Sequence, residues 1–298
     1  MNLFSISQLQ QFSGIKAHTI RMWEQRYNAL KPNRSEGNTR YYDNTQLKRL
    51  LNIVSLMSTD YKISELCSMS DEKLFLLMEE QLKDIIQKDE ASEYYISQLM
   101  SAGVHFDETH FEKIFSNCVL RMGMKDTYIK VIYPMMNRIG LLWMTDKISP
   151  AYEHFISNLV KQKIFVAIDS LPPAKSSGKT WLLFLPEDEF HEIGLLFSHY
   201  LIRQSGDKVI YLGSNVPLDI LLQTKTEIEP SHLLLFFVHY NESADLMEYL
   251  DVLKKNFSEV KIHISGNAKL LGQLKTGNDI QWIHSVDDLE KQLASFNP

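Results

Sequence analysis

The sequence predicts a multi-domain α and α/β protein that begins with small helical elements, continues as a helical bundle and ends in a parallel sheet. Three observations indicate this: short helical segments broken by turns up to residue 60, apolar residues repeating at three and four positions to about residue 170, and short apolar runs separated by helix-length segments thereafter. A chain of 298 residues is long enough for two or three hydrophobic cores. We place the domains at 1–72, 73–172 and 178–298.

The first region predicts two short helices and a wing. The segment SISQLQQFSGI is amphipathic and ends at Gly14, and KAHTIRMWEQRY restarts a helix shortly afterwards. Two short helices joined by a tight Gly-containing turn make a helix-turn-helix. The next segment, LKPNRSEGNTRYY, has Pro, Gly and Asn among cations, which is typical of a β-wing. DNTQLKRLLNIVSLMS then predicts a helix that begins with polar capping residues.

Charge is unevenly distributed along the chain. Residues 1–60 hold eight Lys and Arg against four Asp and Glu, a net charge of +4, which leaves −10 of the total of −6 for the remainder. A basic head on an acidic body indicates a polyanionic partner for the head. We expect the second helix to enter the DNA major groove, with cations around it on phosphates, and Trp23 to lie in a small core. The candidate DNA-binding residues are Lys16, His18, Thr19, Arg21, Arg26, Arg34, Arg40 and Tyr41.

The order of these segments, from ISQLQQFSGIKAHTIRMWEQRY through LKPNRSEGNTRYY to DNTQLKRL, resembles the N-terminal domain of the MerR family of transcription regulators. The resemblance implies a winged helix-turn-helix that binds double-stranded operator DNA as a dimer. It also implies that Arg21, Arg26, Arg40 and Tyr41 stand at the family's DNA-contact positions. MerR metal sensors carry cysteines beyond their dimerisation helix, and this chain has none at such spacing, so we do not expect metal sensing.

The stretch from about residue 71 to residue 170 predicts a four-helix bundle, because several segments in succession carry apolar residues at helical spacing. The segment LPPAKSSGK follows and predicts a linker rather than a phosphate loop, since Pro173 replaces the first glycine and a strand comes next. TWLLFLP, KVIYLG, HLLLFFVHY and VKIHIS are short apolar runs that predict a parallel sheet with crossover helices. We expect Trp282 to pack on an edge strand.

One histidine stands where open α/β sheets bind ligands. His191 follows the first predicted strand of the sheet, at its carboxyl end. A neutral imidazole ligates a metal through one nitrogen when a carboxylate orients the other, and Glu189 is two residues away. Gly194, where the next helix begins, would let a bulky ligand approach the backbone. From the residues alone, both a metal ligand and an ordinary loop histidine stay open.

The pattern E-x-H-x-x-G between that strand and LLFSHYLIRQSGDKVIYLGSNVP resembles the cobalamin-binding domain of methionine synthase and of the MerR-type photoreceptor regulators of the CarH and LitR group. The resemblance implies a Rossmann-like domain with His191 as the lower axial ligand to cobalt and Glu189 as its hydrogen-bond partner. Gly194 would be the gap that admits the nucleotide tail. Gly266 would keep one position of a later Gly-Gly pair.

A second pattern lies in the bundle. Trp143, followed after nine residues by Glu153 and His154, resembles the segment with which those regulators enclose the adenosyl group above the corrin ring. An indole offers a flat apolar surface, and the Glu-His pair offers hydrogen bonds. The resemblance implies adenosylcobalamin between bundle and sheet, controlling self-association as a dimer or tetramer and thereby operator binding. It also implies a repressing oligomer that light releases by breaking the cobalt–carbon bond.

Departures from the pattern keep alternatives open. Phe236 and Phe237 stand on the third strand where the family has Ser-x-Leu, and Met144 follows the bundle Trp where light-sensing members often have His. The bulky rings would narrow the tail channel. The alternatives are a cobalamin-independent MerR-type regulator that responds to a protein partner or another ligand, and a corrinoid methyl-carrier protein. No catalytic Ser-His-Asp or Cys-His arrangement indicates an enzyme.

Composition also bears on location. The first residues lack the pattern of a signal peptide and no run of about 18 apolar residues occurs, so we expect a soluble cytoplasmic protein without membrane contact. Cys67 and Cys118 are too few for a disulfide framework and lack the pairing of a structural zinc site. We interpret both as small buried side chains in a reducing compartment.

Overall fold

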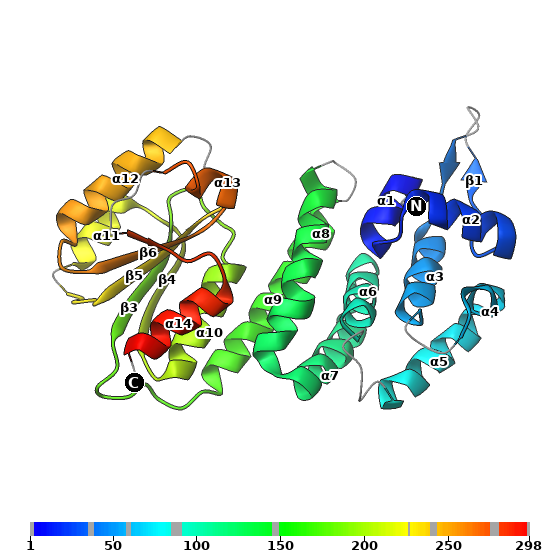
Figure 1. The fold of residues 1–298 in the computed structure, drawn as a ribbon, viewed down its shortest axis with the longest axis horizontal. Helices are drawn as coiled ribbons and strands as arrows, with labels where there is room; N and C mark the ends of the chain where they lie inside the picture. Colours follow the sequence, from blue (N-terminus) through cyan, green and yellow to red (C-terminus); the bar gives the residue numbers. More distant parts are fainter. Residues whose placement is uncertain are drawn as a thin grey trace. The chain divides into compact units, whose positions relative to one another are not determined.

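The computed structural model describes residues 3–34, 39–57, 61–84, 91–144, 149–225, 227–238, 243–274 and 280–296. The chain divides into two compact units, Met1–Leu159 and Val160–Pro298. The first unit is helical apart from a small wing, and the second contains a parallel sheet (Figure 1). The predicted fold class is therefore confirmed, while the division into three domains stays a prediction.

The head forms the predicted helix-turn-helix and wing. Its elements are α1 (Ile6–Ser13), α2 (Ala17–Tyr27), β1 (Asn33–Arg34), β2 (Arg40–Tyr41), α3 (Asn44–Ser55) and α4 (Ile63–Ser68). A capping box between Ser5 and Gln8 starts α1, and Gly14, with φ of 73°, ends it in the left-handed conformation that glycine adopts without strain. Asp43 caps α3. Trp23 is 4% exposed, which confirms its place in the core of the head.

The helical middle consists of α5 (Asp71–Asp84), α6 (Ala91–Val104), α7 (Glu108–Thr127), the π-helical turn η2 (Tyr128–Ile132), α8 (Tyr133–Met144) and α9 (Pro150–Asp169). A Cβ on Gly103 of α6 would lie 2.2 Å from Cδ1 of Ile156 of α9, so the missing side chain lets these two helices approach closely. The break at Gly123, with φ of 77°, and the π turn after it were not predicted.

The head packs on the middle helices through a buried polar network between α3 and α6. The side-chain amide of Gln98 donates to Oγ of Ser55 at 2.6 Å and to Oδ1 of Asn52 at 3.4 Å. Nε2 of His110 on α7 lies 3.0 Å from Oε1 of Gln98. Burial lowers the pKa of His110, so its neutral ring donates to Gln98. Because α3 docks on α6, the head and these helices form one compact unit.

A second contact joins the turn of the helix-turn-helix to α8. The guanidinium of Arg138 lies 3.5 Å from the point where a Cβ of Gly14 would stand. Arg138 also donates to Oε2 of Glu93 on α6 at 3.0 Å. The same helix that carries Trp143 therefore contacts the turn that positions α2.

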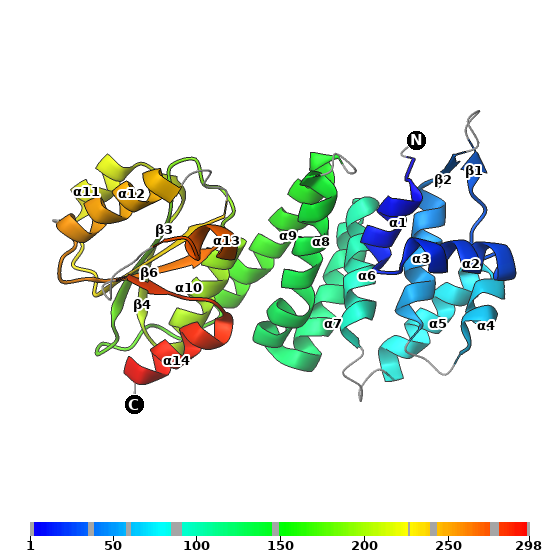
Figure 2. The same cartoon turned by 45° about the horizontal axis from the view of Figure 1, so that its top comes forward.

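The second unit is a doubly wound sheet. Its strands are β3 (Thr180–Pro186), β4 (Lys208–Val216), β5 (His232–Phe237), β6 (Lys261–Gly266) and β7 (Ile280–Trp282), all parallel, in the order β4-β3-β5-β6-β7. Figures 1 and 2 show α10 (Ile193–Ser205) and α14 (Val286–Phe296) on one face, with α11 (Leu218–Thr224) and α12 (Ser243–Asn256) on the other. The short α13 (Ala268–Leu271) follows β6. The predicted parallel sheet and crossover helices are confirmed.

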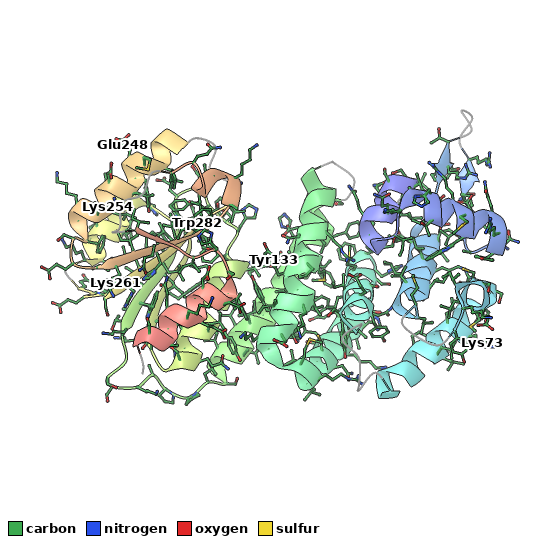
Figure 3. All side chains as sticks on the ribbon, in the orientation of Figure 1. Lys73, Tyr133, Glu248, Lys254, Lys261 and Trp282 are labelled. Carbon is green, nitrogen blue, oxygen red and sulfur yellow. The ribbon has the colours of Figure 1, made fainter. Side chains whose placement is uncertain are left out.

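Strand order changes direction at β3, which places a topological switch point between β3 and β5. Ligands bind open α/β sheets at such a point, beyond the carboxyl ends of the strands. Trp282, labelled in Figure 3, lies on the edge strand β7 as expected. No helix in the described part of the chain combines the length and apolar composition that crossing a membrane requires.

Candidate functional sites

The α2 helix presents most of the predicted DNA-contact residues to solvent. Lys16 occupies its N-cap, and His18, Arg21 and Arg26 are exposed along it, while Thr19 is half-buried. Ile20 and Trp23, on the opposite side, are buried in the head. Apolar anchoring of one face leaves the cations outward, which is the arrangement of a recognition helix.

The wing is fastened to α2 by a carboxylate that the sequence interpretation missed. Nε of Arg40 donates to Oε1 of Glu24 at 2.8 Å, and the hydroxyl of Tyr42 donates to Oε2 at 2.8 Å. The hydrogen bond and charge of Glu24 raise the pKa of Arg40. Burial, and then Glu24, raise the pKa of Tyr42. Arg40 therefore has a structural role, because its bond to Glu24 holds the wing on α2.

The other wing residues lie on the two strands. Arg34 of β1 is exposed and pairs in register with Arg40 of β2, and Tyr41 pairs with Asn33 and is half-buried. The tip between the strands lies outside the described residues. The wing thus carries two arginines side by side, a positive edge suited to phosphate.

A buried carboxylate organises the loop at the switch point. Glu189, whose side chain is 1% exposed, follows β3 and accepts at Oε1 from the backbone N–H groups of Phe190 (3.0 Å) and His191 (3.1 Å). The same oxygen lies 2.6 Å from Nδ1 of His191. A carboxylate only accepts, so Nδ1 carries the proton, and a neutral ring keeps its lone pair on Nε2. The His191 side chain is 44% exposed.

Two neighbouring strand ends brace this loop. Oε2 of Glu189 accepts from the backbone N–H of Val238, directly after β5, at 2.8 Å. The backbone N–H of Asn215, near the end of β4, donates to the carbonyl of Glu189 at 3.1 Å, and Oδ1 of Asn215 accepts from Asp188 at 2.9 Å. The His191 ring is consequently held by the ends of three strands. The signal for Asn215 was its place in the SNVP segment, which the sequence interpretation did not use.

The space beside Gly194 holds an aromatic ring. A Cβ on Gly194 would lie 2.8 Å from Cε1 of Phe236, so the ring packs directly on the start of α10. The expected gap for a bulky ligand is filled there. Phe237 points to the other face of the sheet and is fully buried in the core with α12. Side chains alternate along a strand, so the expectation that both rings narrow the channel is wrong for Phe237.

Gly266 has a structural reason to be glycine. Its φ is 127°, and a Cβ there would lie 2.2 Å from the carbonyl oxygen of Phe237. The backbone N–H of Asn267 donates to that same oxygen at 2.8 Å. Close approach of β6 to β5 therefore explains the glycine.

The pattern of Trp143 with Glu153 and His154 lies only partly within the described residues. On α9, Nδ1 of His154 lies 2.9 Å from Oε2 of Glu153, and the His154 side chain is 70% exposed. The Phe106 ring packs beside them against Tyr152, with centroids 5.1 Å apart. Trp143 lies in the last turn of α8, and its side chain, like that of Met144, falls outside the described residues.

A polar cluster next to the loop was not foreseen. Glu192 accepts from Lys161 Nζ at 3.0 Å and from the hydroxyl of Tyr211 at 3.2 Å. His199 stacks on Tyr211 with centroids 5.3 Å apart, and burial lowers the pKa of His199 to about 4. These contacts hold the start of α10 to Lys161 of α9 and to Tyr211 of β4.

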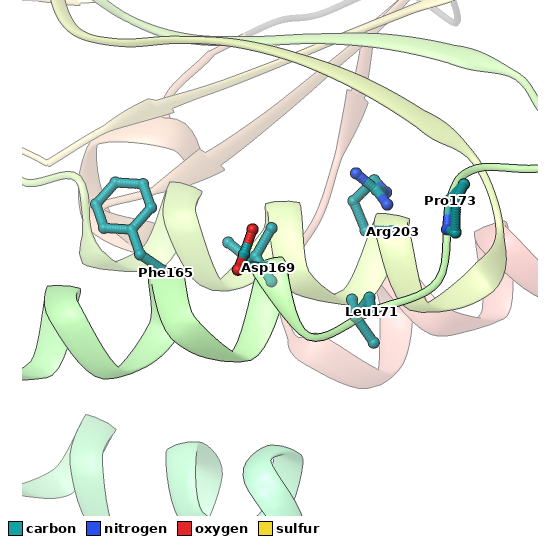
Figure 4. Close-up of a pocket in the computed structure, with 6 residues that line it drawn as sticks. Phe165, Asp169, Leu171, Pro173 and Arg203 are labelled. Carbon is teal, nitrogen blue, oxygen red and sulfur yellow. The ribbon is translucent and has the colours of Figure 1, made fainter.

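A surface pocket lies between the C-terminal ends of α9 and α10 (Figure 4). Phe165 and Asp169 of α9, Leu171 and Pro173 of the linker, and Arg203 of α10 line it. The Arg203 guanidinium donates to the carbonyl of the residue before Pro173 at 2.8 Å, which holds the linker against α10. Because Arg203 is at the far end of α10 from Gly194, this pocket is separate from the loop with His191.

Among the described residues, the side chains that could ligate metal do not form a centre of their own. Within the described ranges no group of three or more His, Cys, Asp or Glu side chains is arranged to hold an ion. Cys67 and Cys118 are buried free thiols, and burial raises the pKa of each to about 11. Both cysteines are therefore buried, as the sequence predicted, and burial of this kind disfavours the reactive thiolate.

Comparison with known families identifies two parts of the chain. Residues 4–72 match the MerR HTH family regulatory proteins. Residues 95–167 match the B12 binding domain family. The first match covers the helix-turn-helix and wing, and the second runs from α6 into α9 and includes Trp143, Glu153 and His154.

Two curated relatives resemble most of the chain. The HTH-type transcriptional repressor CarH of Myxococcus xanthus is 22% identical over 85% of this chain and 84% of its own length. The HTH-type transcriptional repressor CarA of the same organism is 24% identical over 83% and 80%.

Among solved structures, the monomethylamine corrinoid protein of Methanosarcina barkeri aligns with a TM-score of 0.54 at 15% identity, covering 69% of this chain and all of that one. At that identity the likeness shows the fold. The two family matches and the two relatives lead to one conclusion: the chain combines a MerR-type helix-turn-helix region with a B12-binding region, and it is similar over most of its length to two transcriptional repressors.

Proposed function

We propose that the chain represses transcription by binding operator DNA, and that adenosylcobalamin controls this binding. The observation that carries the proposal is the Glu189–His191 pair, held at the switch point of a corrinoid-protein fold in a chain that begins with a MerR head. The sign of regulation follows the two relatives, both of which are repressors.

The donor set at the loop fits a corrinoid. Adenosylcobalamin would supply a cobalt ion that accepts a histidine nitrogen, together with an adenosyl group. Nε2 of His191 would ligate the cobalt from below, because Glu189 holds the proton on Nδ1 and orients the ring. We assign Trp143, Glu153 and His154 to the upper face, where an indole and a hydrogen-bonding pair suit the adenosyl group. Gly194 does not fit the family pattern, because Phe236 fills the space beside it.

Control of DNA binding would run through self-association. The bound cofactor would fix the surface through which copies of the chain meet, as a dimer or tetramer. When DNA-binding domains are linked, the second one binds its half-site at a higher effective concentration, and the overall affinity for repeated half-sites rises. A regulator of this kind works in the cytoplasm, where the DNA is. Light as the stimulus stays a prediction, since Met144 stands where light-sensing members often have His.

A DNA mobility-shift titration of the full chain with promoter fragments from its own locus tests DNA binding by the winged helix-turn-helix. We expect retardation by the wild-type chain and at least about tenfold weaker binding by Arg21→Ala, since a cation on the exposed side of α2 is removed. The matched control is Arg203→Ala, an arginine of the second unit. Failure of the wild type to retard any such fragment would contradict the proposal and favour a corrinoid carrier.

The absorbance spectrum of the chain with adenosylcobalamin in darkness tests the cofactor. We expect a spectrum with histidine on cobalt, and a changed spectrum for His191→Ala. His199→Ala is the control, because His199 is stacked on Tyr211 below the loop. Identical spectra for wild type and His191→Ala would remove His191 from the cobalt.

One alternative has an observation in its favour. Phe236 beside Gly194 suits a regulator that has given up cobalamin and responds to a protein partner or another ligand. Absence of any binding in the same experiment would select it.

A further inference from the structure

Open α/β sheets bind ligands in a crevice beyond the carboxyl ends of the strands at the switch point, and the residues around this place give it a polar and an apolar side. The polar side is the His191 ring with the buried carboxylate of Glu189. The apolar side is the Phe236 ring, which packs on Gly194 where α10 starts. A ligand seated over His191 therefore meets Phe236 if any part of it extends down between α10 and β5.

A hydrogen bond just after Phe236 holds the end of β5 in place. Two residues later, the N–H of Val238 donates to Oε2 of Glu189, whose other oxygen binds His191. Moving the end of β5 to open the crevice would break the hydrogen bond of Val238 to Glu189, the carboxylate that orients His191. Rotation of the Phe236 side chain would open the crevice without moving this backbone, and that rotation loses the contact of the ring with Gly194.

We infer that Phe236 makes this chain select corrinoids by their lower face, preferring those without a nucleotide, of the cobinamide class, over complete cobalamin. The inference rests on the proposed function. With His191 below the cobalt, everything that the corrin ring carries on its lower face is directed to the crevice that Phe236 fills. The adenosyl group on the upper face is unaffected, so the preference concerns only the lower appendage. Losing the burial of one partly exposed phenyl ring corresponds to a preference of roughly tenfold.

The test compares the dissociation constants of adenosylcobinamide and adenosylcobalamin for the full chain in darkness, measured by equilibrium dialysis. For the wild type we expect adenosylcobinamide to bind about tenfold more tightly. Phe236→Ser opens the crevice and should bring the two constants to within about twofold, by tightening adenosylcobalamin. Phe237→Leu is the matched control, because it changes the neighbouring ring on the core face of the same strand and should keep the wild-type ratio.

Thermal unfolding establishes that each variant folds, and Phe236→Ala replaces the serine variant if the latter does not. Equal constants for both corrinoids in the wild type, or a wild-type ratio that survives Phe236→Ser, would overturn the inference while leaving cobalamin control intact. Failure of the wild type to bind either corrinoid would overturn the proposed function itself. The spectrum of bound adenosylcobinamide adds an independent readout, since histidine ligation must be lost in His191→Ala and kept in Phe236→Ser.

Discussion

Single residues of the second unit show how strongly a buried polar group depends on its partners. Glu189 is buried as a carboxylate and stays in place because three backbone N–H groups and one imidazole donate to it. The order Glu-x-His could be read from the sequence as a possible pair. The donor from Val238 could not, since it arrives from a strand almost fifty positions away, and long-range contacts leave no local signal.

A second buried polar group predicts how stability depends on pH. Nδ1 of His232 lies 2.9 Å from Nε2 of His263, and the Trp181 ring stacks on His232 with centroids 4.2 Å apart. Burial lowers the pKa of His232 to about 4 and that of His263 to about 3. Unfolded histidine protonates near pH 6.5. Their contribution to stability is therefore complete above pH 6.5 and falls as the pH drops toward 4 and 3.

We expect the second unit to lose on the order of 2 kcal/mol of unfolding free energy between pH 7.5 and pH 5 through these histidines. Urea unfolding followed by tryptophan fluorescence measures it. His263→Leu removes one titrating group and should flatten the dependence. If this variant lost as much stability as the wild type over that interval, the buried pair would not be the cause.

At the scale of elements, periodicity predicted the helices and strands well because local patterns determine them. The run TWLLFLP coincides with β3, and the linker LPPAKSSGK has neither helix nor strand. The π turn at Tyr128–Ile132 was missed because Ile129 and Ile132 continue the helical apolar spacing of the segments around them. Docking of α3 on α6 through Gln98 was missed as well. Apolar periodicity identifies which face of a helix is buried, but it does not identify the helix that packs against that face.

Packing of α6 on α9 predicts the effect of a single methyl group. Gly103→Ala places a Cβ 2.2 Å from Ile156, so α6 and α9 must separate or repack. We expect a loss of about 1–3 kcal/mol in the unfolding free energy, measured by chemical denaturation. Gly140→Ala on α8 is the matched control, because its Cβ would meet no described atom within 4 Å. That change should stabilise the helix by about 0.5–1 kcal/mol. A Gly103→Ala chain as stable as Gly140→Ala would contradict this packing.

At the scale of the whole molecule, the winged helix-turn-helix packs directly on the other helices of the first unit. Arg138 reaches the turn at Gly14 from the helix that carries Trp143, and Gln98 joins α6 to α3. A change in the helices that accompanies cofactor binding can therefore reach α2 through packed contacts. The sequence predicted the parts and their order, because each has its own local pattern. The contacts that couple them follow only from the structure.

This arrangement predicts that Gln98→Leu weakens the link between cofactor and DNA. The change leaves Asn52 and Ser55 buried without their partner, which costs about 1–3 kcal/mol of stability. We expect a smaller change in DNA affinity on adding adenosylcobalamin than in the wild type, measured by mobility shift. Gln281→Leu, an exposed position on β7 of the second unit, controls for the substitution itself. An undiminished cofactor effect in the Gln98 variant would show that coupling takes another route.

The most direct test of the account is the affinity of the full wild-type chain for its own promoter fragment, titrated in darkness with and without saturating adenosylcobalamin. We predict that the cofactor tightens DNA binding by at least about tenfold, as expected when it promotes self-association and so links several DNA-binding domains. Equal affinity under both conditions, with the cofactor shown by its spectrum to be bound, would contradict cobalamin control of this regulator.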